Sequence, residues 1–331
     1  MKYLKFLLLS FITAIIFSGC SNDVDINASY KDIVVVYGLL ESGENASDTT
    51  FLKINKAFLG DENALIMAKI RDSSEFMKKL EVKMWPEDNP SNVITFDTIT
   101  LNNKDTGTFY NPYQVLYYST FTPENETKYY LQIFYKDIEV TAVASTIENF
   151  RDSDISKPGF AKSIGFKYDV VNPVVWNRKD LAPRYDVTIR FHYKEVWEGQ
   201  TDTIYRFFDW HRDTKKSTFG DEVESYYNGS TFYNALAAYV PYPDADKESK
   251  VVSRFTGVTD FIVEAGGIEL NTFMEVNEPS NSIIQDRPQY SNINNGVGIF
   301  SARTIAVKYK TLNDETKFII KEDYYNLKFE Y

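Results

Sequence analysis

The stretch RYDVTIRFHYKEV, residues 184–196, has the most regular alternation of apolar and polar side chains in this sequence. The apolar members share one face of an extended strand and are Tyr185, Val187, Ile189, Phe191 and Tyr193. The polar members share the other face and are Asp186, Thr188, Arg190, His192 and Lys194. Such alternation is typical of a half-buried β-strand. The stretch therefore predicts a sheet with one face against a core and one face toward solvent.

The segments that follow this strand predict a second β-rich domain, residues 160–331. DTIYRFFDW (202–210) is suited to pair with 184–196 as a hairpin. STFYNALAAYV (230–240) changes to helical spacing and stops at a proline, so it predicts a short helix. DFIVEAGGIELNTFMEV (260–276) predicts two short strands broken at its paired glycines, and alternation predicts two more strands, 304–312 and 324–331.

The preceding part, residues 31–148, predicts a β-sandwich. Short runs with strand patterning are separated by Gly, Asn, Asp and Pro; they are 33–40, 50–58, 79–85, 93–101, 114–121, 124–135 and 138–146. An insertion at 60–79 is suited to a helical turn or two. TPENETKYYLQIFY (122–135) resembles the strand-F region of immunoglobulin-like modules, which implies an immunoglobulin-like β-sandwich. The polar segment 149–159 ends in Pro158–Gly159 and predicts a linker between the two domains.

The N-terminus resembles a bacterial lipoprotein signal. Two lysines precede the apolar run 6–17, which is shorter than the roughly 20 residues of a membrane-spanning helix. Ser18, Gly19 and Cys20 follow in the order of a lipobox, although Phe17 replaces the usual leucine. This resemblance implies that residues 1–19 are a signal peptide and that Cys20 is acylated. The alternative is an ordinary secretory signal with a chance cysteine.

Acidic residues follow the cysteine and bear on where the protein lies. Residues 20–30 show no apolar periodicity and predict a flexible tether. Asp23 and Asp25 within it resemble the acidic export tag of Bacteroidota surface lipoproteins. That resemblance implies an outer-membrane, lipid-anchored protein that faces the cell exterior. The alternative is a solvated tether without an export role.

The charge and the residue types narrow the function classes. The 331 residues carry 47 acids against 36 lysines and arginines, a net charge of −11, which disfavours nucleic-acid partners. Cys20 is the single cysteine, so its acylation leaves no thiol for a disulfide, a zinc site or a nucleophile. GVGIFS (296–301) lacks the third glycine of a dinucleotide loop. We therefore assign no catalytic residue, no metal site and no cofactor.

Two further groups of residues lack the spacing of a metal site. The two histidines, His192 and His211, lack ligand spacing, although the hairpin offers a way for them to meet. The acidic loop 242–248 lacks the glycine and distal glutamate of a calcium loop. Paired carboxylates for glycoside hydrolysis stay possible, because the distance between two carboxyl groups in the folded protein decides whether they form such a pair.

Aromatic side chains are dense between 197 and 233 and mark the candidate binding surface. We expect ligand-binding residues at Trp197, Trp210 and Tyr233, with the alternative that these rings form a core. The strand 202–210 carries aromatic rings on both faces, and both faces cannot meet solvent. Stacking on such rings needs neither a metal nor a titrating group.

Two passages carry a resemblance to a family. FLKINKAFLGDENALIMAKIRDSSEF (51–76) and NEPSNSIIQDRPQYSNINNGVGIFSARTIAVKY (277–309), with its Asn-rich turn and Gly296, Gly298 and Phe300, resemble Bacteroidota surface lipoproteins of unknown function. The resemblance implies an outer-membrane, β-rich lipoprotein. We expect a non-enzymatic binding or accessory module whose partner is a glycan or an outer-membrane transporter. The alternatives are a glycan-active hydrolase and a fimbrial subunit that exchanges the strand 324–331.

Overall fold

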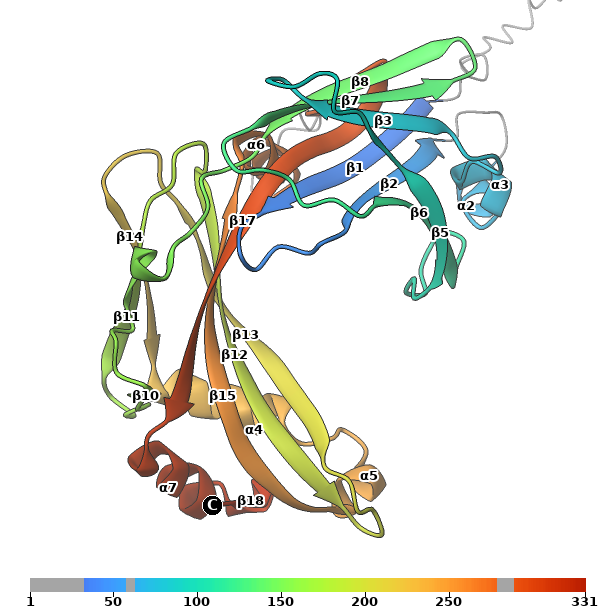
Figure 1. The fold of residues 1–331 in the computed structure, drawn as a ribbon. Coiled ribbons are helices and arrows are strands. Elements are labelled where there is room, and N and C mark those ends of the chain that lie inside the picture. The colour runs from blue at the N-terminus through green and yellow to red at the C-terminus, as the bar shows by residue number, and fades with distance from the viewer. Residues whose placement is uncertain (1–32, 58–62, 279–288) are drawn as a thin grey trace, which may run out of the picture.

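The computed structural model describes residues 33–57, 63–278 and 289–331 and shows a mostly β protein. Its N-terminal part contains a β-sandwich, as expected (Figure 1). One sheet of the sandwich is five-stranded and runs β16 (Ile293–Asn294), β8 (Ile138–Ser145), β7 (Lys128–Tyr135), β3 (Glu81–Pro86) and β4 (Ile94–Thr95). The finer resemblance to immunoglobulin-like modules stays a prediction.

The other sheet of the sandwich is part of a ten-stranded sheet. Its strands on the sandwich side are β1 (Ile33–Ser42), β2 (Thr50–Ala57), β6 (Tyr113–Ser119) and β5 (Asp97–Asn102). Alternation turns every second residue inward, so that Val34, Val36 and Leu40 on β1 are buried in the core. The two faces meet there in an apolar interior, and the intervening residues of β1 point outward.

One strand, β17 (Gly296–Leu312), runs through both halves of the molecule. Its first half pairs in parallel with β1, from Val34 opposite Gly296 to Ser42 opposite Thr304. Its second half pairs antiparallel with β15 (Val251–Gly266). The ten-stranded sheet then continues through β12 (Arg184–Trp197) to β13 (Ile204–Lys216). Figure 1 shows these long strands extending away from the sandwich. This corrects the expectation that all of 160–331 forms one second domain, because residues 293–304 complete the sandwich.

The expected linker, 149–159, is also built into the fold. It contains the 3₁₀ turn η1 (Asp152–Asp154) and β9 (Ile155–Lys157). Asp154 is buried and accepts hydrogen bonds from Lys179 at 2.8 Å and from Asn177 at 2.9 Å. The segment is therefore packed, and the polar residues that suggested a linker serve instead as partners in a buried network.

Helix α4 (Gly229–Tyr239) and a small sheet cover one face of the part of the ten-stranded sheet that is formed by β12, β13, β15 and the second half of β17. The small sheet holds β9, β11 (Val171–Asn177) and β14 (Glu222–Asn228). Helix α4 lies where 230–240 predicted a helix, and Asn228 caps its N-terminus by accepting from the Thr231 N–H at 2.8 Å. Phe232 on α4 contacts Phe191 on β12, with ring centroids 5.7 Å apart. The hairpin of 184–196 with 202–210 is confirmed as β12 and β13.

Two sequence-based strands are wrong. The second strand expected within 260–276 is helix α6 (Ile268–Asn277), in which Leu270, Phe273 and Met274 take helical spacing toward one side. The terminal strand expected at 324–331 is reduced to β18 (Phe329–Glu330), which pairs in parallel with β15 of the same chain. The other elements before and between these are α2 (Ala64–Met67), α3 (Arg71–Ser74), β10 (Ser163–Ile164), α5 (Ala245–Ser249), α7 (Asp314–Asp323) and η2 (Tyr325–Leu327). No helix of the described ranges is long and apolar enough to cross a membrane.

Candidate ligand-binding groove

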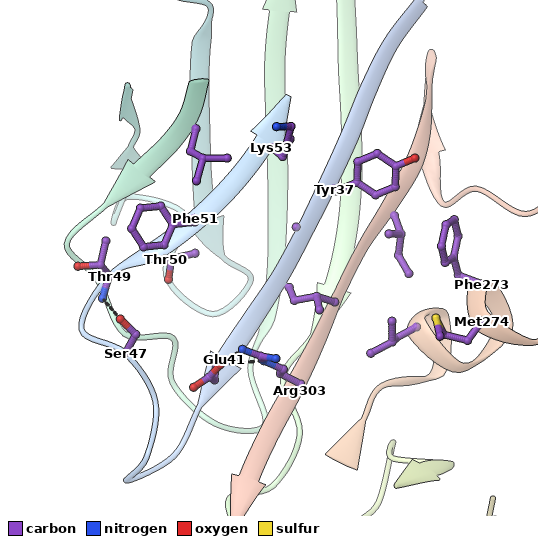
Figure 2. Close-up of a pocket in the computed structure, with 15 residues that line it drawn as sticks. Tyr37, Glu41, Ser47, Thr49, Thr50, Phe51, Lys53, Phe273, Met274 and Arg303 are labelled. Carbon is purple, nitrogen blue, oxygen red and sulfur yellow. Dashed lines mark hydrogen bonds and ion pairs between the residues drawn. The ribbon is translucent and has the colours of Figure 1, made fainter. Parts of the chain in front are cut away.

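A groove of about 560 Å³ lies between the outer face of the sandwich and helix α6 (Figure 2). Its floor and walls come from β1, β2, β6, β17 and α6. The volume falls within the roughly 300–1,000 Å³ that is usual for small-molecule sites. The groove is therefore large enough for a small-molecule ligand.

Strand alternation places the groove's side chains. Because Val36 and Leu40 point into the core, Tyr37 and Glu41 on the same strand point outward. Phe51 lies on the outer face of β2, beside the inward-pointing Leu52. The sequence of β1 thus supplies a core face and a groove face at once.

Helix α6 is held against β17 by its first turn. The Gly267 N–H donates to the Ala302 carbonyl at 2.9 Å, and the Leu270 N–H donates to Ser301 Oγ at 3.1 Å. A Cβ at Gly267 would lie 3.0 Å from Ser301 Oγ and 3.2 Å from the Ala302 oxygen. Glycine at this position permits the close approach, which brings Phe273 and Met274 to the groove.

Three aromatic rings from three elements line the groove. Tyr37, in the middle of β1, is 46% exposed, and Phe51, the second residue of β2, is 43% exposed. The ring of Tyr37 meets the ring of Phe273 edge to face, with centroids 6.3 Å apart. Phe51 lies beside Tyr118 at 6.4 Å. Partly exposed rings gathered in a groove mark a binding surface more strongly than single exposed apolar residues do.

Charged groups lie among the apolar ones. Arg303 Nε donates to Glu41 Oε2 at 2.7 Å, and Figure 2 shows this ion pair at one end of the groove. Lys53 donates to Gln114 Oε1 at 2.5 Å. Burial lowers the pKa of the Lys53 ammonium, and the nearby Lys104 lowers it further. The groove thus offers ring faces together with a guanidinium, an ammonium and a carboxylate group.

Two of the expected binding residues are core residues instead. Tyr233 is completely buried, and its hydroxyl donates to the Phe166 carbonyl at 2.7 Å. Trp210 is only 7% exposed and lies against Phe232, with ring centroids 5.8 Å apart. Neither ring has a free face for a ligand, which corrects their assignment as ligand-binding residues.

Trp197, the third expected binding residue, lies apart from the other two. It is half-buried at the far end of β12, where its Nε1–H donates to Glu195 Oε2 at 3.2 Å. Its ring meets that of Tyr242 edge to face at 5.4 Å. The three residues therefore do not form one surface. The exposed rings of this hairpin are those of Tyr205 and Phe207, on the other face of β13.

The two histidines do not meet. His192 lies opposite Phe207 in the hairpin, whereas His211 lies opposite Thr188. His192 Nε2 lies 2.7 Å from Asp260 Oδ2. Among the residues that the structure describes, no group of three or more His, Cys, Asp or Glu side chains is placed to hold a metal ion.

The expected lipidation and export residues, Cys20, Asp23 and Asp25, lie outside the described residues. The sequence alone does not predict the groove, because it predicts a strand where α6 lies. A signal was present, since Leu270, Phe273 and Met274 follow helical spacing after a glycine pair.

No family model matches the chain, and no curated protein matches it.

Proposed function

We propose that this protein is a lipoprotein anchored in the outer membrane through Cys20, facing the cell exterior, and acting as a non-enzymatic binding module for glycans. Its binding site is the groove between α6 and the sandwich. The order Ser18–Gly19–Cys20 and the acids Asp23 and Asp25 support the anchor and the outward orientation.

The single observation that carries the binding role is the set of partly exposed rings along the groove. Tyr37, Phe51 and Phe273 offer faces and edges on which the C–H face of a sugar ring can pack. The Glu41–Arg303 pair and Lys53 add an acceptor and donors within reach of hydroxyl groups. Apolar walls with a few placed polar groups are usual for small-molecule sites.

The charge of the protein selects among glycans. A net charge of −11 repels polyanions at long range, so neutral glycans are favoured over sulfated or uronic-acid-rich ones. Binding to a neutral glycan should accordingly depend little on salt, because no counterions are released.

The test uses the full protein against a panel of immobilised neutral polysaccharides. Removing two rings in the variant Tyr37→Ala with Phe273→Ala should weaken binding at least about fivefold, because each ring contact contributes about 0.5–1.5 kcal/mol. The matched control is Tyr205→Ala with Phe207→Ala, which removes two exposed rings from β13 and should leave binding unchanged. Circular dichroism checks that both variants keep the native fold.

The alternatives give different results in the same experiment. Equal binding by the groove variant and the control variant would contradict the groove as the site. Release of reducing ends from a bound polysaccharide would favour the glycan-active hydrolase. Loss of a co-purifying outer-membrane transporter in the groove variant, without any glycan binding by the native protein, would make the transporter the partner.

A further inference from the structure

A second surface, on residues 63–79 at the edge of the sandwich, presents large apolar side chains to solvent. Leu65 is 65% exposed and Ile66 is 61% exposed, and Ile70 and Met77 are exposed as well. This segment is described as α2, α3 and the turns around them. Single exposed apolar residues are ordinary, but several in one short segment mark an interaction surface.

A neighbouring loop extends this surface. The Tyr110 N–H donates to the Ala68 carbonyl at 2.9 Å, which fixes the loop between β5 and β6 against α2. Phe109, next in the chain to Tyr110, is exposed, and the Lys104 ammonium lies 5.8 Å from its ring centroid. Apolar side chains therefore come together from two segments that are distant in the sequence.

The same surface is locally basic on an acidic protein. Residues 63–79 contain the four cations Lys69, Arg71, Lys78 and Lys79 and the two acids Asp72 and Glu75. Both acids are paired, Asp72 with Lys56 at 3.3 Å and Glu75 with Arg71 at 2.8 Å, and Lys79 is paired with Asp97 at 2.8 Å. Lys69 and Lys78 are exposed and add to the positive charge, whereas the whole chain carries −11.

The start of the described chain lies beside this surface. Ile33, the first residue of β1, pairs with Ala57 at the end of β2, and the Lys56–Asp72 ion pair joins β2 to α3. Figure 1 shows α2 and α3 next to these strand ends. The 13 residues from Cys20 to Ile33 span at most about 45 Å when fully extended. A lipid on Cys20 would therefore hold this surface close to the membrane.

We propose that residues 63–79 dock on an anionic lipid surface. Leu65, Ile66 and Ile70 enter the boundary between headgroups and acyl chains, while Lys69 and Lys78 lie against headgroup phosphates. Exposed apolar side chains flanked by lysines are the usual chemistry of proteins that lie on a membrane. Since the rest of the surface is acidic and repelled by the same lipids, this contact sets the orientation of the protein. The proposal rests on the proposed anchor for its proximity to the membrane.

The test adds the purified protein to vesicles that contain a lipid with a photoactivatable group in its acyl chain. Two compositions are compared, phosphatidylcholine alone and phosphatidylcholine with phosphatidylglycerol. Mass spectrometry then maps the crosslinked peptides. We expect crosslinks on 63–79 in the anionic vesicles and none on 245–258, which lies at the end of the ten-stranded sheet away from the sandwich (Figure 1).

Charge variants sharpen the result. Lys69→Gln and Lys78→Gln should each lower the crosslink yield on 63–79 about fivefold in anionic vesicles. The matched control, Lys247→Gln with Lys250→Gln, removes two exposed lysines near α5 and should leave the yield unchanged. Crosslinks spread over the surface, or no difference between the two sets of variants, would overturn the proposal.

The proposed anchor is read out separately from the same sample, as the mass of the peptide that contains residue 20. An acylated Cys20 without crosslinks on 63–79 supports the anchor and overturns the docking surface. Crosslinks on 63–79 with an unmodified Cys20 support the docking surface and contradict the anchor. A third outcome is that 63–79 stays unlabelled in pure vesicles but is crosslinked to another protein in cells. That outcome would overturn the proposal, because the occupant would be a protein rather than lipid.

Discussion

Arg254 Nε and Glu195 Oε1 lie 3.0 Å apart, and neither side chain is exposed to solvent. Glu248 binds the same guanidinium at 2.7 Å, and Arg254 also donates to the Leu327 carbonyl at 2.9 Å. The Tyr242 hydroxyl donates to Glu195 Oε2 at 2.7 Å. This network joins β12 and β15 to the C-terminal segment, in which β18 pairs with β15.

The first prediction concerns this network. Arg254→Ala should lower the free energy of unfolding by about 3–5 kcal/mol, because Glu195 is left buried without its charge partner. Urea denaturation followed by circular dichroism measures the change. Lys79→Ala, which breaks the exposed pair with Asp97, is the control and should cost less than about 1 kcal/mol. A similar loss in the free energy of unfolding for both variants would contradict the greater effect expected for the buried pair.

The second prediction concerns the pH dependence of stability through Asp154. Burial raises the pKa of this carboxyl, but bonds from Lys179, the Arg151 N–H and Asn177 outweigh burial and lower it overall. A depressed pKa in the folded state stabilises the fold above the ordinary value of about 3.9, and this stability is lost as pH falls through the folded value. Asp154→Asn should therefore be less stable than the native protein at neutral pH. The difference should shrink below about pH 4 in urea titrations at stepped pH, and a constant difference would contradict the assignment.

The third prediction tests the corrected role of the aromatic cluster. Trp210→Ala should destabilise the protein by about 3–5 kcal/mol, as expected for a large ring removed from a core. Tyr205→Ala, on the exposed face of the same strand, should change stability by less than about 0.5 kcal/mol. Thermal unfolding measures both. A native-like melting temperature for Trp210→Ala would restore this ring as a candidate binding residue.

The fourth prediction follows from the shared strand β17. A fragment that ends at residue 149 should not fold, because β1 loses its parallel partner in β17 and β8 loses β16. A peptide of residues 289–312 added in excess should restore strand content in circular dichroism. A stable fragment without that peptide would show that the sandwich is complete on its own.

The fifth prediction concerns the anchor. Cys20→Ala should release the protein from the membrane fraction, because two or more acyl chains are needed for stable anchoring and this residue would carry them. Replacing Asp23 and Asp25 by Ala should keep the protein in that fraction but reduce its cleavage by external protease. Cell fractionation and protease shaving measure the two effects. Unchanged shaving would contradict the export role alone.

Local patterns in the sequence determined much of the secondary structure. A continuous apolar run marked β1. Alternation marked β12 and its hairpin with β13, because side chains of a strand point to opposite faces whatever its partners are. Helical spacing marked α4, and the stop at Pro241 agreed with the end of the helix at Tyr239. The mostly β class followed from these elements without any knowledge of how they pack.

Tertiary structure alone decided which face of a strand is buried and which strands are neighbours. Alternation separates Phe207 from Trp210, but only the position of α4 decides that Trp210 is covered and Phe207 exposed. Likewise, nothing local in β17 shows that one half pairs with β1 and the other with β15, since the partners on β1 lie 262 positions away and those on β15 lie 37 to 53 positions away. The groove depends both on which strand faces are exposed and on which elements are neighbours, because α6 must pack on β17 before Phe273 can contact Tyr37.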